Sequence, residues 1–439
     1  MLLLRNGTII TGDGKRVLED HSLAIEGNRI IAIGRQLPAE GREVVDLAGD
    51  YLLPGLINHH AHGCTMGPLF ASGSPPLSRA EVLANLDKQL QGGVTTVLNV
   101  DGFAAPEEVE VVNAWHPLTV KTATSHSPAN IEAALAVDGQ GLGAVHRQLT
   151  MAEMWEWGAV AVGEVGSGHT LGGGGQEYMY IPLRVREETG ISLTPRQARR
   201  LKEAVLGRYL DVEKFDREGV DELLKEWGLE DKLTAEGAAE LVRESVLPSL
   251  VPAREGIREA AIEARLLGAP LIVHNAAPTK ELLQELARQG GTLVAAHSNH
   301  DSFTPGEALA QARHLRREGA IIDIATFDAF GARETTPAPE HFFAFLEYGQ
   351  ADLISTDYGG GKFDPPLVGV KAALERGLGS LPDLVAKLTS RVAQVFPRLA
   401  PERGVIEEGK IADLIVVSRQ DVALVKQVYI GGRLVLGRR

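Results

Sequence analysis

Two histidines that lie two residues apart stand at the end of an apolar segment. Residues 54–63 read PGLINHHAHG, and the apolar part, YLLPGLI, is short and punctuated by proline and glycine, which is typical of a buried strand. Because residues i and i+2 of a strand point to the same face, we expect His60 and His62 side by side, with His59 pointing away. Two imidazoles in this arrangement suit a metal ion, with nitrogen ligands at about 2.0–2.1 Å. The structural alternative is a pair of histidines that only hydrogen-bond near the strand end.

The strand that carries this pair is one of eight apolar segments that alternate with helix patterns. After it, SRAEVLANLDKQLQGG has helical spacing, with Ser78 as the expected N-cap and glycines at the end. Near-continuous apolar strands between helices indicate a parallel sheet covered on both faces, and eight such units predict an α/β fold, a (β/α)₈ TIM-like barrel. The eight expected strands are YLLPGLI, VTTVLNV (94–100), PLTVKTAT (117–124), GAVAVGEVG (158–166), APLIVHN (269–275), GTLVAAH (291–297), GAIIDIAT (319–326) and ADLIST (351–356).

Both ends of the chain and one long segment do not fit the barrel pattern. Residues 1–53 contain alternating β patterns joined by Gly and Asn turns, and residues 400–439 are similar. Because the termini of a domain often lie close together, we expect the two ends to form a small β-sandwich domain beside a barrel of residues 54–399. Residues 176–250 are charged, helix-patterned and far longer than an ordinary loop, which predicts a helical insertion over the barrel mouth.

The composition limits the partners and the location of the protein. The 439 residues are 44% hydrophobic, as in ordinary globular proteins, and the net charge of −14 argues against nucleic acid or an anionic membrane as a partner. No apolar run approaches the roughly 20 residues that cross a bilayer, and the N-terminus turns polar early, unlike a signal peptide. The single Cys64, expected to be buried, excludes an internal disulfide. We therefore expect a cytoplasmic protein, a homo-oligomer, that acts on a small molecule.

Six polar residues end the expected strands, where the chemistry of such barrels is found. A half-buried histidine bonded to the backbone, or an aspartate that caps the next helix, would explain each of them alone. Their coincidence at one end of the barrel favours a shared site, because four imidazoles and two carboxylates can hold two divalent ions and leave positions for water. The six candidate ligands are His60, His62, Glu164, His274, His297 and Asp357.

At these positions the sequence resembles the amidohydrolase superfamily of metal-dependent hydrolases. The resemblance spans nearly the whole chain except the insertion. It implies that His60, His62 and Asp357 bind the more buried of two metal ions. His274 and His297 would bind the more exposed ion, and a residue of the fourth strand would bridge both. The motifs that carry the resemblance are PGLINHHAH, STDYG and the closing GVIEEGKIADLIVV.

The residue at the bridging position departs from a frequent pattern of that family. Many members use a carboxylated lysine, but GAVAVGEVG contains no lysine, and Glu164 takes the position. The two oxygens of a glutamate can each bind one ion of a pair about 3.5–4 Å apart, and a glutamate needs no CO₂. GEVGSG looks most like the enamidase branch, whereas adenine deaminases carry a similar Gly-Glu pair. Asn58 stands where an aspartate is common in the family.

The resemblance implies an enzyme that hydrolyses a C–N bond other than a peptide bond. Metal coordination lowers the pKa of water from about 15.7 towards about 7, and Asp357 would pass its proton to the leaving nitrogen. Zinc is the first expectation for the two ions, and iron or manganese is compatible with the ligands. The expected substrate is a small cyclic amide, imide or enamide. The alternatives are a deaminase of a purine- or pyrimidine-like heterocycle, distinguished by released ammonia, and a non-catalytic relative, which would not need six ligands.

Several further residues are candidates that also have ordinary structural explanations. The glycine-rich segment 166–175 lacks the ending of a phosphate loop and is expected to be a flexible loop. His126 suits a turn as well as substrate contact, and Asp101, His300 and Asp323 are weaker candidates. The arginines of the insertion would either meet a substrate carboxylate or face water; they are Arg184, Arg186, Arg196, Arg199 and Arg200.

Overall fold

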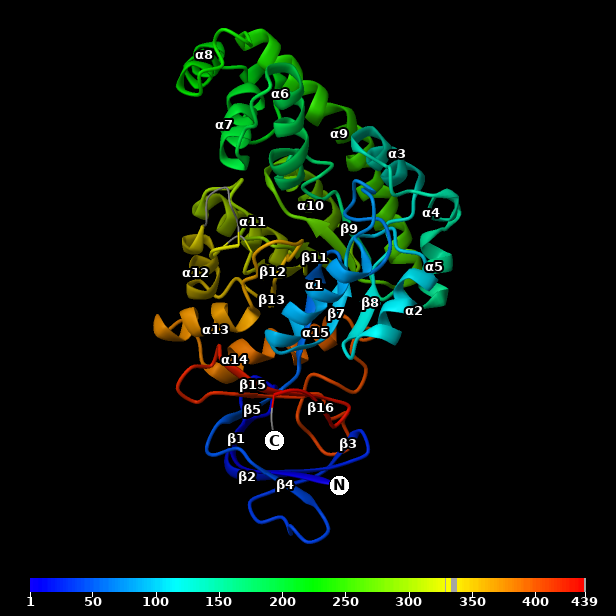
Figure 1. Ribbon diagram of the computed structural model, residues 1–439, viewed down its shortest axis with the longest axis vertical. Helices are drawn as coiled ribbons and strands as arrows, with labels where there is room; N and C mark the ends of the chain where they lie inside the picture. The colour runs from blue at the N-terminus through cyan, green and yellow to red at the C-terminus, as the bar shows by residue number, and fades with distance from the viewer. Residues whose placement is uncertain (328, 333–337, 438–439) are drawn as a thin grey trace.

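Strands and helices alternate through the middle of the chain in the computed structural model, which describes residues 1–327, 329–332 and 338–437. β-Strands from both ends of the chain lie together at one end of the molecule (Figure 1). The helices of residues 176–250 lie at the opposite end, and the alternating strands and helices lie between the two. One end of the alternating strands and helices therefore faces the helices of residues 176–250, and the opposite end faces the strands from the two chain ends.

Eight parallel strands form the middle of the molecule, and each overlaps one of the segments expected to be a strand. The first segment, YLLPGLI, is divided: Leu56 and Ile57 belong to the parallel strand, whereas Tyr51–Pro54 form a strand of the sheet built from the two chain ends. They make two sheets, in the orders β6-β7-β8 and β13-β12-β11-β10-β9. Isolated bridges link the sheets, between Ala61 and Tyr358 and between Thr124 and Val162. Most residues of these strands are buried on both faces, as expected of strands between helices. The bounds are β6 Leu56–Ala61, β7 Val94–Asn99, β8 Thr119–Thr122, β9 Val162–Val165, β10 Leu271–His274, β11 Leu293–Ala296, β12 Ile321–Ala325 and β13 Leu353–Ser355.

The helices around these strands begin at residues that their sequences indicate. Ser78 accepts a hydrogen bond from Glu81 N, and the Glu81 carboxylate accepts one from Ser78 N, a capping box that confirms Ser78 as the N-cap of α1 (Arg79–Gln91). None of the helices in the described ranges is long and apolar enough to cross a membrane. The others here are α2 Pro106–Trp115, α3 Pro128–Val137, α4 Ala144–Gln148, α5 Met151–Trp157, η3 Ala277–Thr279, α10 Lys280–Ala287, α11 Pro305–Arg317, α12 Pro339–Glu347, α13 Pro366–Glu375, α14 Leu381–Ala386 and α15 Ser390–Val395.

The long segment between β9 and β10 folds into helices with an apolar core of their own. Buried residues such as Val185, Leu201 and Val242 pack together in that core. The last helix runs on to Leu267, because its second half keeps a buried apolar face that packs against α3. The elements are η1 Gln176–Tyr180 (a π-helix), α6 Ile181–Thr189, α7 Pro195–Leu206, η2 Val212–Lys214, α8 Arg217–Glu226 and α9 Ala235–Leu267.

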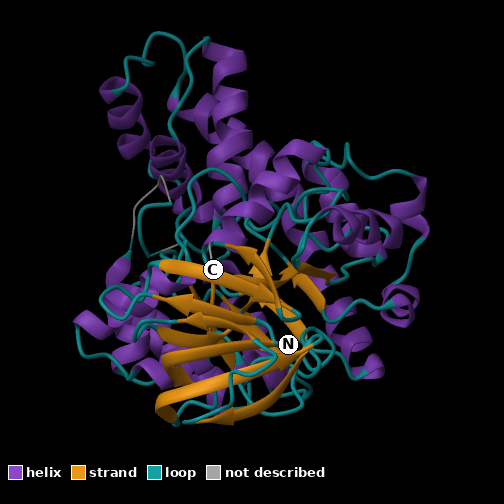
Figure 2. Ribbon diagram, turned by 60° about the horizontal axis from the view of Figure 1, so that its bottom comes forward, coloured by secondary structure: helices purple, strands orange, loops and turns teal. Residues whose placement is uncertain are grey.

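The two ends of the chain join into one eight-stranded sheet (Figure 2). The strand order is β16-β15-β14-β5-β1-β2-β3, and β4 pairs with β1. The antiparallel pairing of β5 with β14 connects the N-terminal and C-terminal strands. Leu4, Leu23, Leu414 and Tyr429 belong to its buried apolar cluster. The bounds are β1 Leu2–Ile10, β2 Val17–Glu26, β3 Arg29–Gly34, β4 Glu43–Asp46, β5 Tyr51–Pro54, β14 Leu414–Val417, β15 Val425–Ile430 and β16 Arg433–Leu436.

Candidate functional site

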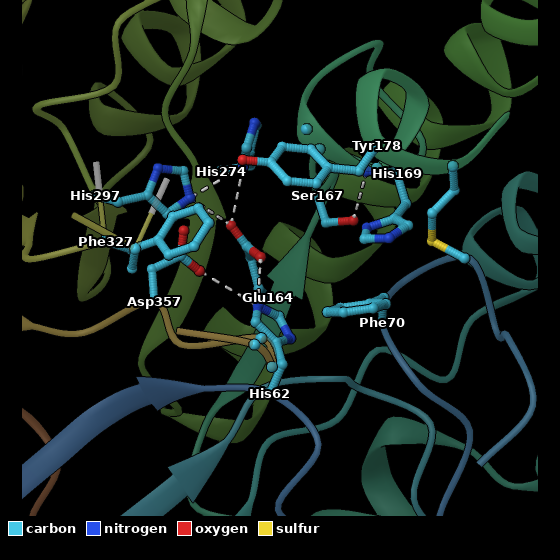
Figure 3. Close-up of a pocket in the computed structure, with 18 of the residues that line it drawn as sticks. His62, Phe70, Glu164, Ser167, His169, Tyr178, His274, His297, Phe327 and Asp357 are labelled. Atoms are coloured by element: carbon cyan, nitrogen blue, oxygen red, sulfur yellow. Dashed lines mark hydrogen bonds and ion pairs between the residues drawn. The ribbon is translucent and has the colours of Figure 1, made fainter. Parts of the chain in front are cut away.

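The six candidate ligands meet at the carboxyl ends of the parallel strands, and Figure 3 shows all of them except His60. His60 and Glu164 lie within β6 and β9, and His274 is the last residue of β10. Parallel strands bring their carboxyl ends to one edge, which explains why residues far apart in the sequence converge here. The other three follow strands: His62 comes directly after β6, His297 directly after β11, and Asp357 two residues after the end of β13.

Glu164 lies between two pairs of histidines. Its Oε1 is 3.1 Å from His274 Nδ1 and 2.8 Å from His297 Nε2. Its Oε2 is 3.6 Å from His60 Nε2 and 3.7 Å from His62 Nε2. One carboxylate oxygen therefore faces each pair, which is the geometry that a bridge between two cation sites requires.

Asp357 stands beside the first of these pairs and also reaches the cavity. Its Oδ1 is 3.3 Å from His60 Nε2 and 3.4 Å from His62 Nε2. Asp357 N donates a hydrogen bond to His60 O, and the residue has a positive φ of 49°, an uncommon conformation for aspartate. Its side chain is 19% exposed, whereas that of Glu164 is 2% exposed. Asp357 is therefore the carboxylate of the cluster that water reaches.

The donor atoms of the cluster fit divalent metal ions. His274 Nδ1 and His297 Nε2 lie 3.0 Å apart against the same oxygen of Glu164, and the buried His60 Nε2 has no hydrogen-bond partner in the described part of the chain. Cation coordination would satisfy both features, two ring nitrogens crowded against one carboxylate oxygen and a third buried ring nitrogen without a hydrogen bond. Three groups of potential ligand atoms lie within 4.8 Å of one another: His60–His297–Asp357, His60–His62–Glu164 and Glu164–His274–His297.

The charged groups of the cluster strongly shift one another's pKa values. Burial disfavours a charged imidazole, but Asp101 and Asp357 outweigh it at His62 and raise its pKa to about 9. Burial likewise opposes charge on His60, yet Glu164 and Asp357 raise its pKa well above the ordinary value. Burial would raise the pKa of Glu164, but the surrounding histidines hold it well below its usual range. The pocket thus favours ionised carboxylates beside positive charge.

Asp101 holds the His62 ring from behind. Its buried carboxylate accepts a hydrogen bond from His62 Nδ1 over 2.8 Å, which leaves Nε2 for the cluster. The same Oδ1 accepts a bond from Phe70 N, and Oδ2 accepts one from Gly63 N, each over 2.9 Å. Asp101 directly follows the segment 94–100, so the strand-end criterion that identified the other residues also points to it.

Neighbouring polar residues hold other parts of the cluster. As the strand alternation predicts, His59 points away from the cluster, and its ring stacks on Phe396. Asp323 Oδ2 accepts a hydrogen bond from His297 N, and its Oδ1 lies 3.0 Å from His59 Nε2. Asn58 donates hydrogen bonds to Gln89 and Thr356 instead of carrying a charge.

A cavity of about 470 Å³ opens onto the cluster. Figure 3 shows Phe327 and Asp357 on one side of Glu164, and Phe70 and His169 on the other. The rings of Phe70 and His169 stack with centroids 4.0 Å apart. Burial, followed by the positive charge of His62, lowers the pKa of His169 to about 3, so its ring is neutral at pH 7. The glycine-rich segment that the sequence presents as a loop thus forms a wall of the cavity.

The other sequence candidates divide between the cavity and the protein interior. His300 lines the cavity, and so does Tyr178 of η1. His126 is buried, packs edge-on against Phe103 and is not among the described residues that line the cavity. Cys64 is buried, and burial raises the pKa of its thiol. Sequence reasoning gave no reason to choose Tyr178, because the signal that selects it is spatial.

The arginines of the insertion do not serve the cavity. Arg184 pairs with Glu244, and Arg200 pairs with Glu226, both at the surface. Arg199 forms an ion pair with Asp301. None of the five arginines is among the described residues that line the cavity, so the expectation that they meet a substrate carboxylate there is wrong. Acidic residues take up the charges of Arg184, Arg199 and Arg200 instead.

Comparisons with known proteins give partial matches in sequence and a shared fold over nearly the whole chain. No protein-family model matches the chain. A dihydroorotase of Lactobacillus leichmannii is 31% identical over 205 residues, 44% of this chain and 40% of that protein. An adenine deaminase of Geobacillus kaustophilus is 33% identical over 108 residues, 25% of this chain and 15% of that protein. The chain thus spans less than half the length of these relatives. The structure of a beta-aspartyl dipeptidase from Fervidobacterium islandicum has a TM-score of 0.58 at 16% identity, covers 99% of this chain and 96% of that one, and shows a shared fold.

Proposed function

We propose that the chain is a member of the amidohydrolase superfamily, a metal-dependent hydrolase that opens a small cyclic amide, imide or enamide at its C–N bond; the partial match to a dihydroorotase supports this. The observation that carries the proposal is the position of Glu164, whose two carboxylate oxygens face separate pairs of histidines. This arrangement supports two divalent ions per chain. Zinc is the first candidate, and iron or manganese also suits mixed imidazole and carboxylate ligands.

The residues of the cluster divide into two sets around Glu164. His60, His62 and Asp357 would hold one ion, and the remaining two histidines would hold the other. Ions at these positions would acidify a water molecule and polarise the carbonyl of the substrate. The walls of the cavity would orient a small ring beside Asp357 and limit its contact with bulk water.

Asp357 is the proposed catalytic residue. It accepts the proton of the water molecule that attacks the carbonyl carbon, and it delivers that proton to the ring nitrogen as the C–N bond breaks. Its exposed fraction of 19% supports this role, because water reaches its carboxylate from the cavity. The interaction of its carboxylate with His297, His60 and His62 outweighs the effect of burial and keeps its pKa low, so it is ionised before the reaction. A proton transfer of this kind contributes about 10²–10⁴ in rate.

A substrate screen with one variant tests the proposal. Zinc-reconstituted protein is incubated with hydantoin, dihydrouracil and related cyclic amides, and ring opening is followed by NMR. We expect ring opening without ammonia, a loss of about 10²–10⁴ in rate for Asp357→Asn, and near-unchanged rates for Asp231→Asn, an exposed change in the helical segment. Near-normal turnover in Asp357→Asn would remove this residue from the mechanism.

A deaminase is the second candidate, supported by the match to an adenine deaminase over 25% of this chain. It would use the same cluster and differ in the bond that breaks, since an exocyclic amine would leave as ammonia. The dihydroorotase match covers 44% of this chain and favours ring opening. Release of ammonia from adenine or a related aminated heterocycle, in preference to ring opening in the same screen, would reverse this order.

The proposal also covers the domain architecture, the branch of the family, the cellular location and the oligomeric state. The two parallel sheets would close into a (β/α)₈ barrel of residues 54–399, with a helical insertion at 176–250, and the bridges Ala61–Tyr358 and Thr124–Val162 support that closure. The sheet built from residues 1–53 and 400–439 would be a small β-sandwich domain. GEVGSG supports the enamidase branch. The net charge of −14 supports an enzyme without nucleic-acid or membrane partners, and the single Cys64 fits the reducing cytoplasm proposed as its location. Light scattering would test the expected homo-oligomer.

A further inference from the structure

One charged side chain lines the cavity besides the candidate metal ligands. Among the described residues of the wall, that side chain is Lys362, which follows three glycines after β13. Apart from those ligands, the other described residues of the wall are glycine, aromatic residues, histidines, Met179 and small side chains. In a protein with a net charge of −14, a cavity wall whose single extra charge is positive selects for an anion locally.

The turn that carries this lysine has unused hydrogen-bond donors. The backbone N–H groups of Gly359, Gly360, Gly361 and Lys362 donate no hydrogen bond within the described part of the chain. Gly360 and Gly361 have positive φ angles of 118° and 68°, which glycine adopts without strain. Consecutive N–H groups in a turn of this kind form a concave site that binds anions.

Lys88 fixes the turn from the side. Its Nζ donates to Gly361 O over 2.7 Å and to the Tyr358 hydroxyl over 2.8 Å. The Tyr358 hydroxyl donates in turn to Asn85 Oδ1. These bonds engage a carbonyl of the turn, and no described residue accepts a hydrogen bond from its N–H groups, so the donors are already positioned before a ligand arrives.

We propose that the Gly359–Lys362 turn binds a carboxylate carried by the substrate, which makes the substrate a small acidic ring with a scissile C–N bond. The inference rests on the proposed function for the scissile bond, but the carboxylate site stands on the turn itself. A single lysine balances one negative charge, and a cavity of about 470 Å³ suits a ring with one small substituent. A carboxylate meets both conditions.

A pair of ring compounds that differ in one charge tests the site. The probes are 2-pyrrolidone-5-carboxylate and the neutral 2-pyrrolidone-5-carboxamide, and saturation-transfer NMR titration of zinc-reconstituted protein gives the Kd of each. The same spectra show any ring opening, so binding and hydrolysis are read separately. We expect wild type to prefer the acid by about tenfold, as one charge-assisted contact provides. The preference should disappear in Lys362→Met and persist in Lys225→Met, which removes an exposed lysine of α8 far along the chain.

Each outcome decides the proposal. Loss of the preference in Lys362→Met alone supports it, even if neither compound is hydrolysed. A preference that survives Lys362→Met would come from the metal ions and would overturn it. Equal binding of the two compounds to wild type, or binding of neither, would also overturn it. Failure of the proposed reaction is a separate result, because that would appear as absent ring opening across the whole substrate screen.

Discussion

Replacement of Asp101 by asparagine tests whether the metal ligands depend on the residues behind them. The buried carboxylate of Asp101 accepts three hydrogen bonds, from His62 Nδ1, Phe70 N and Gly63 N. An asparagine has one carbonyl oxygen and one NH₂ group in the same space. Whichever way its amide turns, the NH₂ group meets at least one of these N–H donors, so a buried donor loses its acceptor.

The size of the effect depends on which N–H donor loses its acceptor. If His62 loses its acceptor, its ring can place the proton on Nε2, which then no longer coordinates a cation. Changes in residues that orient a metal ligand typically weaken metal affinity by about 10–100-fold, or about 1.4–2.8 kcal/mol. If Gly63 loses its acceptor instead, the unpaired buried N–H costs about 1–3 kcal/mol of folding stability.

Competition with a zinc chelator measures the affinity, and thermal melting of the same samples measures the stability. Asp87→Asn is the matched control, because Asp87 is an exposed aspartate that lies 3.1 Å from His116 Nε2, away from the cavity. We expect a loss of zinc affinity in Asp101→Asn alone. Unchanged affinity and unchanged melting in Asp101→Asn would refute the role of this residue, and so would an equal loss of affinity in Asp87→Asn.

Three further predictions concern stability. Burial, then the charge of a neighbouring histidine, lowers the pKa of His126 from 6.5 to about 4. Between pH 6.5 and 4 the unfolded chain therefore takes up a proton that the folded chain excludes, and the free energy of unfolding falls by about 3 kcal/mol as the pH drops. In thermal melts His126→Gln should show a weaker dependence of stability on pH over this range. An equal dependence in the variant and wild type would contradict the prediction. A Cβ at Gly175 would overlap the His169 ring, so Gly175→Ala should cost about 1–3 kcal/mol, whereas Gly174→Ala, with open space around it, should melt like wild type. Lys202 is buried in an ion pair, so Lys202→Met should cost about 3–5 kcal/mol, and an unchanged melting temperature would show that the pair contributes nothing.

The candidate ligands could be identified from the sequence because a local rule selects them. Each of them lies in the last residues of an apolar strand or within two residues after it, and parallel strands bring those positions together. Asp101 fits the same rule, since it lies two residues after the end of β7. The sequence does not mark Asp101 as a strong candidate, because a carboxylate that hydrogen-bonds a metal ligand has no spacing motif of its own. The hydrogen bond to His62, which spans 39 residues, becomes visible only in three dimensions.

The walls of the cavity could not be predicted, because they depend on contacts between distant segments. Phe70 and His169 stack although 99 positions separate their numbers in the sequence. The turn at Lys362 faces the cavity because its neighbours hold it there, and GGGK alone resembles an ordinary surface loop. The pairing of β5 with β14 likewise joins the two chain ends, and neither segment specifies its partner locally. The ion pairs of Arg184 and Arg199 could not be predicted for the same reason, because their acidic partners Glu244 and Asp301 lie on other elements.

Metal analysis of zinc-reconstituted protein tests most directly whether Glu164 joins two metal sites. Its two oxygens face His60 and His62 on one side and His274 and His297 on the other. We expect two zinc ions per chain in wild type, and at most one in the double variant His60→Ala, His62→Ala and in the double variant His274→Ala, His297→Ala. Two ions retained in both double variants, or no zinc bound by correctly folded wild type, would contradict the proposed centre.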